Sequence, residues 1–212
     1  MPAGTAAGEM NYYNGTAWIT IAPTANDGAH FTMTAGVPSW TGGTPPPPPA
    51  IGDFRDGGVV FWVDPTDNTH GLVCAIEYQG SGIHWYNGNY TTTGATGTAI
   101  GTGSANTTAI IESQGAIETA YAAGVARAYD GGGYTDWFLP SKGELNQMYL
   151  NRATINSTAT ANGGSNFTDA YHWSSSEDDN NVRAWVHGFH NGLQTIDGKN
   201  SGNNSMRAVR AF

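Results

Sequence analysis

The sequence is poor in cysteine and in positive charge, and each shortage excludes a class of structure or ligand. Cys74 is the one cysteine among 212 residues, so no disulfide can form within the chain. It lies in an apolar run, Gly71-Leu72-Val73-Cys74-Ala75-Ile76, which predicts a buried small side chain. The chain has 8 lysines and arginines against 17 aspartates and glutamates, which gives a net charge of −9. Because polyanions are bound by clustered cations, this balance argues against nucleic acids, sulfated polysaccharides and anionic membranes as ligands.

Long apolar runs are also missing. No stretch approaches the roughly eighteen apolar residues of a membrane-spanning helix, so we expect no membrane insertion. The first four residues show no basic stretch leading into an apolar one, as a signal peptide would. Two origins stay open: a piece of a longer bacterial surface protein, or a phage structural component. Both predict an extracellular, cell-surface or virion location.

Proline is concentrated in one place, Thr44-Pro45-Pro46-Pro47-Pro48-Pro49-Ala50, which predicts an extended linker. It separates residues 1–43 from residues 51–212. In the first part, Asn14-Gly15 predicts a tight turn between two strands, and residues 31–40 predict a further strand and turn. A β-rich stalk this small cannot bury its own aromatic side chains, which are Tyr12, Tyr13, Trp18, Phe31 and Trp40. We expect it to self-associate, with a trimer favoured; the alternative is that it folds back on the larger domain.

The larger domain begins with strands and continues with helices. Residues 57–64 and 72–76 predict a hairpin, and a loop rich in glycine and threonine follows at about 87–104. One helix is expected from a cap at Asn106 or Thr107 to a point before Gly131, because apolar side chains recur at helical spacing: Ile110, Ile111, Ile117, Ala120, Tyr121 and Val125.

The second half of this domain predicts one more helix and then strands. Ser141 and Glu144 have the spacing of a capping box, which marks the start of a helix. Residues 171–176, 183–189 and 206–212 predict strands. The order of hairpin, helices and further strands indicates an α+β fold, with two helices around a small antiparallel sheet.

Several phrases in the larger domain together resemble one family. They are Gly57-Gly58-Val59-Val60-Phe61, Asp136-Trp137-Phe138-Leu139-Pro140-Ser141 with Glu144-Leu145, Trp173-Ser174-Ser175-Ser176-Glu177, Ala184-Trp185 with Phe189-His190-Asn191-Gly192, and Arg207-Ala208-Val209-Arg210. These phrases resemble the C-terminal domain of bacterial collagen-like adhesins and its relatives in Bacteroidetes-type surface proteins. That family is similar to the variable proteins of diversity-generating retroelements, which have a C-type lectin fold. The resemblance covers residues 51–212, and residues 13–18 resemble short stalk modules that precede such domains.

The resemblance implies a C-type-lectin-like domain and assigns structural roles. Trp137, Leu139 and Pro140 would hold the second helix against the sheet. Trp173 and Trp185 would lie in the core. Arg207 and Arg210 would lie on the last strand and order nearby loops.

Residues 178–205 are the expected ligand-binding segment, because short polar side chains and glycines suit an exposed, hydrogen-bonding face. The candidate residues are Asp178, Asp179, Asn180, Asn181, Arg183, Val186, His187, Gly188, His190, Asn191, Leu193, Thr195, Ile196, Asp197, Asn200, Ser201, Asn203, Asn204 and Ser205. The expected ligand is a protein or glycan on a target-cell surface. The alternative interpretation is a solvated asparagine-rich loop with no ligand.

The retroelement resemblance makes a further expectation about this segment. Retroelement diversification acts on adenines, chiefly in AAC asparagine codons, and substitution of the first two bases never yields Trp, Gln, Lys, Met or Glu. Trp185, Gln194 and Lys199 fall outside the allowed set, so they are the candidate fixed positions between residues 178 and 205.

Metal and enzyme functions find less support in the sequence. Glu177-Asp178-Asp179 could attract calcium, although the calcium-lectin phrases Glu-Pro-Asn and Trp-Asn-Asp are absent. A zinc site shared by His172, His187 and His190 is not expected, because His187 and His190 are interpreted as facing opposite sides of a strand. Formylglycine-generating enzymes share the lectin-like fold but use a pair of cysteines. This chain has Cys74 alone, in an apolar run, so that activity is not expected.

We therefore expect a receptor-binding protein or adhesin with a hypervariable face, no catalytic residue and no cofactor. The alternative is a lectin of fixed specificity or a carbohydrate-active enzyme. A glycosidase needs two carboxylates at a defined separation, and Glu177 and Asp179 could form such a pair.

Overall fold

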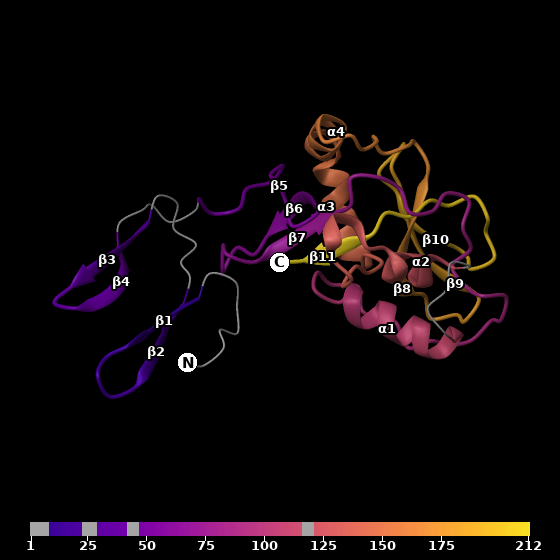
Figure 1. The fold of residues 1–212 in the computed structure, drawn as a ribbon. Coiled ribbons are helices and arrows are strands. Elements are labelled where there is room, and N and C mark those ends of the chain that lie inside the picture. The colour runs from indigo at the N-terminus through magenta and orange to yellow at the C-terminus, as the bar shows by residue number, and fades with distance from the viewer. Residues whose placement is uncertain (1–8, 23–28, 42–46, 116–120) are drawn as a thin grey trace. The chain divides into compact units, whose positions relative to one another are not determined.

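The computed structural model describes residues 9–22, 29–41, 47–115 and 121–212 (Figure 1). The chain divides into two compact units, Met1–Pro48 and Pro49–Phe212. Thr44, Pro45 and Pro46 of the expected linker lie outside the described residues.

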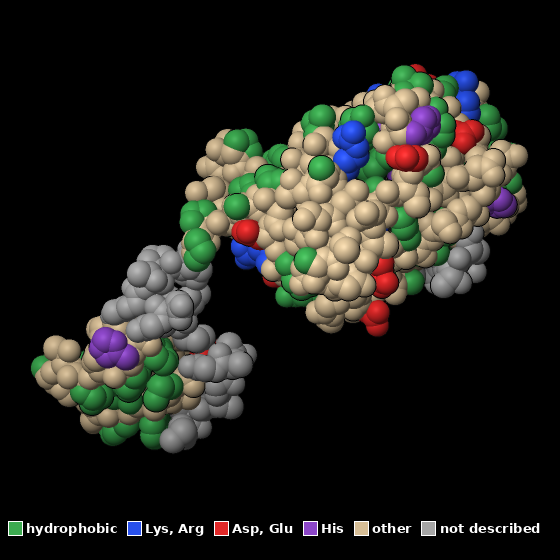
Figure 2. Space-filling view, turned by 90° about the horizontal axis from the view of Figure 1, so that it is seen from above, with side chains coloured by type: hydrophobic (Ala, Val, Ile, Leu, Met, Phe, Trp, Pro, Cys, Tyr) green, Lys and Arg blue, Asp and Glu red, His purple; other side chains and the backbone are tan. Residues whose placement is uncertain are grey.

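The first unit contains two antiparallel hairpins. β1 (Met10–Tyr13) pairs with β2 (Trp18–Ile21), and β3 (His30–Thr34) pairs with β4 (Val37–Thr41). The Asn14-Gly15 turn predicted from the sequence is confirmed: Asn14 Oδ1 accepts hydrogen bonds from the amides of Thr16 and Ala17 at 2.9 and 2.8 Å. Gly15 has a φ of +95°, a backbone conformation that favours glycine. Figure 2 shows hydrophobic side chains over much of the visible surface of this unit.

The second unit is a mixed α+β structure with two antiparallel sheets. The four-stranded sheet has the order β11-β7-β6-β5, and its strands are β5 (Phe54–Arg55), β6 (Gly58–Val63), β7 (Gly71–Cys74) and β11 (Val209–Ala211). The three-stranded sheet has the order β10-β9-β8, and its strands are β8 (Tyr171–Glu177), β9 (Arg183–Gly188) and β10 (Gln194–Gly198). The last strand of the chain thus joins the first hairpin of the unit, and the α+β class predicted from the sequence is confirmed.

The helices differ from the sequence prediction. In place of two, the described residues of this unit form α1 (Gly103–Gln114), α2 (Ala122–Ala128), α3 (Lys142–Leu150) and α4 (Arg152–Ala161), with a short 3-10 turn, η1, at Gly131–Gly133. The polar sequence of α4 gave little apolar signal, because Ile155 and Ala159 are its only buried residues. α3 contacts β6 of one sheet and β8 and β9 of the other, so it helps to join the two sheets.

The single long helix expected before Gly131 is wrong. α1 is followed by Gly115 at φ +110°, and the residue before α2, Tyr121, has an extended backbone. Ile117 and Ala120 of the expected helix lie outside the described residues.

The expected caps of the two helices have opposite outcomes. The cap at Asn106 or Thr107 is wrong, because α1 begins after Thr102 and both side chains lie inside it. Their hydrogen bonds go instead to the Gly97 and Gly103 carbonyls, at 2.7 and 2.8 Å. The capping box of α3 is confirmed by reciprocal hydrogen bonds between Ser141 and Glu144.

Large aromatic side chains fill the core of the second unit. Trp85, Trp137 and Trp173 are completely buried. Cys74 is buried as predicted, and burial raises the pKa of its thiol to about 12, so it stays protonated and unreactive. Trp137 and Leu139 are both core residues next to Phe138, which bridges to Val209 of β11.

Candidate functional site

The predicted binding segment, residues 178–205, forms the exposed edge of the three-stranded sheet together with the loops around it. β9 pairs with β10 from Arg183↔Gly198 to His187↔Gln194, and β10 is the edge strand. β10 was not predicted, because its sequence, Gln194-Thr195-Ile196-Asp197-Gly198, is short and largely polar. On the visible face of this unit, charged side chains are few and scattered (Figure 2).

Fourteen of the candidate residues have exposed or partly exposed side chains. The exposed ones lie in the loops that flank β9 and β10 and are Asp179, Asn180, Asn181, His190, Asn191, Leu193, Asn200 and Asn203. The partly exposed ones are Asp178, Arg183, Thr195, Ile196, Asp197 and Ser201.

The other five candidates, Val186, His187, Gly188, Asn204 and Ser205, are buried, which corrects the expectation that they form part of an exposed face. Val186 pairs with Trp173 on β8 and belongs to the core. The ring of His187 packs against Tyr149, with centroids 4.6 Å apart. Val186 and His187 are neighbours in β9 and point to opposite faces of the sheet, so both faces are covered at this end of the strand, one by the core and the other by Tyr149 of α3.

Gly188, Asn204 and Ser205 are held by close packing and hydrogen bonds. A Cβ atom on Gly188 would lie 2.5 Å from Asn191 Oδ1. Asn204 Nδ2 donates to Asp197 Oδ2 at 2.8 Å, and the Ser205 amide donates to the Tyr171 carbonyl at 2.9 Å. These residues shape the surface from beneath it.

A hollow of about 230 Å³ lies within this sheet region. It is lined by residues of all three strands: Tyr171, Val186, Thr195, Ile196 and Asp197. The ring of exposed His190 meets the ring of Tyr171 edge-on at 5.1 Å. The hollow therefore combines an aromatic wall with hydroxyl and carboxylate groups, which suits a small polar portion of a larger ligand.

The carboxylate of Glu177 is buried and fully engaged. It forms an ion pair with Lys199, and both side chains are almost completely inaccessible. It also accepts hydrogen bonds from the Thr93 amide at 2.8 Å, the Thr93 hydroxyl at 2.9 Å and the Gly94 amide at 3.1 Å. A carboxylate with this many partners serves to fix the loop around Thr93, and it presents no free oxygen to a cation or a glycosidic bond.

The other two residues of the Glu177-Asp178-Asp179 cluster lie in different surroundings. Asp178 pairs with Arg183 at 2.8 Å, and Asp179 is exposed. Within the described parts of the chain, no group of three or more His, Cys, Asp or Glu side chains is placed to share a metal ion.

Two of the histidines considered as zinc ligands are enclosed by aromatic rings. His172 and His187 lie 4.2 and 5.5 Å from Phe189, measured between ring centroids. His172 Nδ1 lies 3.1 Å from the Ala170 carbonyl and Nε2 lies 2.8 Å from the Tyr78 hydroxyl. Because a carbonyl can only accept, Nδ1 carries the proton and Nε2 accepts from Tyr78. Desolvation lowers the pKa of His172 to about 3 and also lowers the pKa of His187, so both imidazoles are neutral at physiological pH.

The three candidate fixed positions all contact the scaffold. Lys199 is completely buried in its ion pair with Glu177. Gln194 Nε2 donates to the Lys142 carbonyl at 3.1 Å. The Lys142 ammonium lies 3.2 Å from the centre of the Trp185 ring. Trp185 is only partly buried, so its expected place in the core is corrected to a place at the surface beside Lys142.

The two arginines near the C-terminus order loops, as the sequence suggested. Arg207 is buried between the rings of Tyr78 and Phe167, at 4.5 and 4.1 Å, and donates to the Ser165 carbonyl at 2.9 Å. Arg210, in β11, pairs with Asp136 at 2.5 Å. Arg207 precedes β11 and is not part of it.

Sequence reasoning gave no functional role to residues 79–91, a loop rich in glycine, asparagine and aromatic residues. Its backbone is joined to the binding segment: the Ile83 amide donates to the Asn204 carbonyl at 3.1 Å, and the Trp85 amide donates to the Lys199 carbonyl at 3.0 Å. The available signal was compositional, because tyrosine, serine, glycine and asparagine are the residues that recognition loops use most.

Comparison with family models relates the chain to known proteins. A family model described as the Lcl C-terminal domain matches residues 66–210, which include every candidate binding residue. A search of curated proteins finds no significant match.

Proposed function

Because the chain belongs to the Lcl C-terminal domain family, we propose that it is a receptor-binding protein or adhesin that presents residues 178–205 to a ligand. In this proposal the unit Pro49–Phe212 is a C-type-lectin-like domain, and the ligand is a protein or glycan on a target-cell surface. The chain would act outside the cell, on a cell surface or on a virion. Among the described residues, no helix has the length and apolarity needed to cross a bilayer.

The observation that carries the proposal is a separation of roles within one segment. Asp179, His190, Asn200 and Asn203 expose their side chains and make no side-chain hydrogen bond with the described residues. Val186 and Lys199, a few positions away, are buried and hold the strands. Exposed polar side chains contribute little to folding stability, so their role is better explained by contact with a ligand.

The same separation supports diversification by a retroelement as the finer form of the proposal. The three residues that adenine-directed mutation of AAC codons cannot produce, Trp185, Gln194 and Lys199, each contact the scaffold. Exposed asparagines occupy the loops, at Asn180, Asn181, Asn191, Asn200 and Asn203. The neighbouring DNA tests this directly: a reverse-transcriptase gene and a near-copy of this coding segment, differing at adenines, are expected. If both are absent, the proposal of diversification by a retroelement is wrong, and the adhesin proposal is unaffected.

A binding experiment tests the adhesin proposal. The fluorescently labelled full chain is applied to a panel of intact bacterial and animal cells, and the cell type that binds best is kept. Asp179, His190, Asn200 and Asn203 are then replaced together by alanine. We expect binding to this cell type to fall by at least about tenfold, which corresponds to about 1.4 kcal/mol. The melting temperature should hardly change, because these side chains are exposed.

The matched control is a set of exposed polar residues elsewhere in the same unit, Glu112→Ala on α1 and Ser157→Ala on α4. The control should bind as the unchanged protein does. Equal binding by both variants would show that residues 178–205 do not contact the ligand. Unfolding of the first variant would show that its residues are structural.

No catalytic step is included in the proposal. A glycosidase needs one carboxyl group free to donate a proton and another free to attack or to activate water. The Glu177 carboxylate is committed to Lys199, Thr93 and Gly94. This engagement supports recognition without chemistry, and a cofactor is not required for it.

A further inference from the structure

A second surface of the Pro49–Phe212 unit has the features of a ligand site. It is formed by residues 79–91, called here the aromatic loop, which read Gln79-Gly80-Ser81-Gly82-Ile83-His84-Trp85-Tyr86-Asn87-Gly88-Asn89-Tyr90-Thr91. Nothing in the proposed function uses this loop. It contains no lysine, arginine, aspartate or glutamate.

The aromatic loop is fixed by buried contacts at its centre and its end. Trp85 is completely buried and its Nε1 donates to the Ser174 carbonyl at 2.8 Å. The buried Lys199 ammonium lies 4.5 Å from the Trp85 ring centre and donates to the Thr91 carbonyl at 2.9 Å. Because its anchors are rigid, the loop loses little conformational entropy when it binds.

Gln114 of α1 holds the outer part of the same loop. Its side-chain oxygen accepts from the Asn87 amide at 2.9 Å, and its Nε2 donates to the Thr91 hydroxyl at 2.7 Å. Gln114 is buried, so two of its polar atoms serve only to shape the loop. A loop built this firmly, yet ending in exposed aromatic rings, is preorganised in the way that binding sites are.

The rings that the loop exposes form a row. The His84 and Tyr86 centroids are 6.1 Å apart, and those of Tyr86 and Tyr90 are 4.8 Å apart with their planes inclined by 31°. Tyr90 leaves 42% of its surface exposed, although burying it would be favourable. Exposed tyrosines next to one another offer flat apolar faces with hydroxyl groups at their edges.

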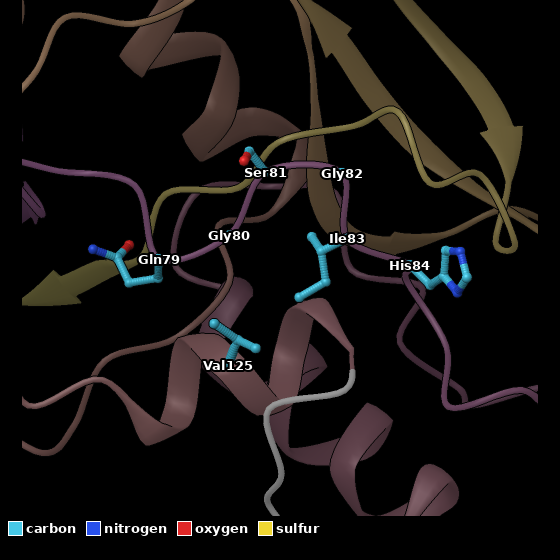
Figure 3. Close-up of a pocket in the computed structure, with 7 residues that line it drawn as sticks. All are labelled: Gln79, Gly80, Ser81, Gly82, Ile83, His84 and Val125. Atoms are coloured by element: carbon cyan, nitrogen blue, oxygen red, sulfur yellow. The ribbon is translucent and has the colours of Figure 1, made fainter.

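One end of the row meets a hollow of about 400 Å³. Figure 3 shows Ile83 and Val125 pointing toward each other, while His84 projects away from them at one end. Ser81 also lines the hollow. Neither its hydroxyl group nor the His84 ring forms a hydrogen bond with a described residue, although the His84 ring packs against Tyr86. The hollow thus has an apolar floor and polar groups around it, at the size of a small ligand.

We infer that the aromatic loop binds an uncharged saccharide, with one sugar ring stacked on the exposed ring of Tyr90, which packs on Tyr86, and an adjoining unit in the hollow beside Ser81 and His84. A pyranose ring has an apolar C–H face, which suits a tyrosine ring, and hydroxyl groups around its edge. The loop itself carries no cation, none of the residues given for the hollow is a lysine or arginine, and Lys199, which contacts the loop from beneath, is buried and paired with Glu177. This lining therefore favours an uncharged ligand over a sulfated or phosphorylated one. A protein ligand would bury a far larger area than this row and hollow offer.

Binding of the full chain to an array of immobilised oligosaccharides tests this inference. The array carries neutral oligosaccharides ending in glucose, galactose, mannose or N-acetylhexosamine, and sulfated counterparts of each. We expect at least one neutral oligosaccharide to bind, and its sulfated counterpart to bind no better. Tyr90→Ala and Tyr86→Ala together should weaken that binding by about tenfold or more. Tyr90→Phe, which keeps the ring, should retain most of it.

The alanine set for the second arm is Asp179→Ala with His190→Ala, and Asn203 is left unchanged because its neighbours Gly202 and Asn204 contact the aromatic loop. It should leave oligosaccharide binding unchanged, because the saccharide site lies on the aromatic loop. The inference is overturned if no neutral oligosaccharide binds at millimolar concentration, if only sulfated ones bind, or if the tyrosine variants bind as well as the unchanged protein. Loss of saccharide binding in the alanine set alone would place the sugar on residues 178–205 and overturn the inference while leaving the proposed function intact.

Discussion

The two units of the chain treat their aromatic residues in opposite ways. In Met1–Pro48, Tyr13 and Trp18 pack on each other at 5.5 Å but leave 54% and 43% of their surfaces exposed. In Pro49–Phe212, Trp85 and Trp173 are completely buried. Each N-terminal hairpin has two strands, and the described residues of that unit include no helix to cover them, whereas helices contact both sheets of the larger unit.

This difference indicates what each unit needs in order to be stable. The larger unit contains its own core, with two clusters of buried apolar residues. The hydrophobic surface of the smaller unit, visible in Figure 2, is left for another surface to cover. We therefore keep self-association as the proposed role of the N-terminal unit and recognition as that of the larger unit.

Tryptophan replacement should show the comparison most strongly. We expect Trp173→Ala to lower the free energy of unfolding of the larger unit by about 3–5 kcal/mol, because it opens a cavity in a close-packed core. Trp18→Ala removes a ring that is already 43% exposed, so the free energy of unfolding of the smaller unit should fall by less than about 1 kcal/mol. Trp185→Ala should fall between them, because its ring is partly exposed beside Lys142. Urea denaturation followed by circular dichroism measures all three; equal losses would contradict the contrast.

Acid should destabilise the larger unit through His172. Its pKa is lowered by burial from 6.5 to about 3, so the unfolded chain binds a proton at a pH where the folded protein does not. The stability that neutral His172 contributes is complete above about pH 6.5 and is lost as the pH falls toward 3. A shift from 6.5 to about 3 corresponds to a loss of about 4–5 kcal/mol at pH 3, at 1.36 kcal/mol per pKa unit.

The control for this pH effect is His172→Phe, which keeps an aromatic ring beside Phe189 and removes the titration. When unfolding free energies are measured between pH 3 and 7, the stability of the unchanged protein relative to His172→Phe should fall steadily as the pH falls. The burial of Glu144 raises the pKa of its carboxyl in both proteins, so that contribution cancels in the difference. A constant difference across the range would show that His172 titrates normally.

Local patterns predicted the parts of the fold that depend on neighbours in sequence. The Asn14-Gly15 turn and the Ser141–Glu144 capping box are confirmed because each is made by residues within four positions of one another. The break between α1 and α2 was missed because it lies where apolar spacing continued across it, and only the backbone of Gly115 shows the end of α1.

Contacts between distant residues were beyond the sequence. Lys199 belonged to a polar segment and was singled out only by codon reasoning, whereas its partners Glu177 and Thr91 are 22 and 108 positions away. His187 alternates with its neighbours like any strand residue, and nothing in the sequence states that Tyr149 covers it. The exposed loop residues of 178–205 were easier to recognise, because short polar side chains without apolar periodicity suit a surface.

The smallest expected effect comes from separating the two units. A chain of residues 51–212 should unfold with a free energy within about 0.5 kcal/mol of that of the same unit in the full chain, because the larger unit has its own core. Light scattering should find the full chain as an oligomer, with a trimer expected, and residues 51–212 as a monomer. If the full chain is also a monomer at micromolar concentration, the N-terminal unit does not drive self-association. A loss of more than about 1 kcal/mol, again well above the usual effect of surface changes, would show that the hairpins cover part of the larger unit, which is the alternative that the sequence left open.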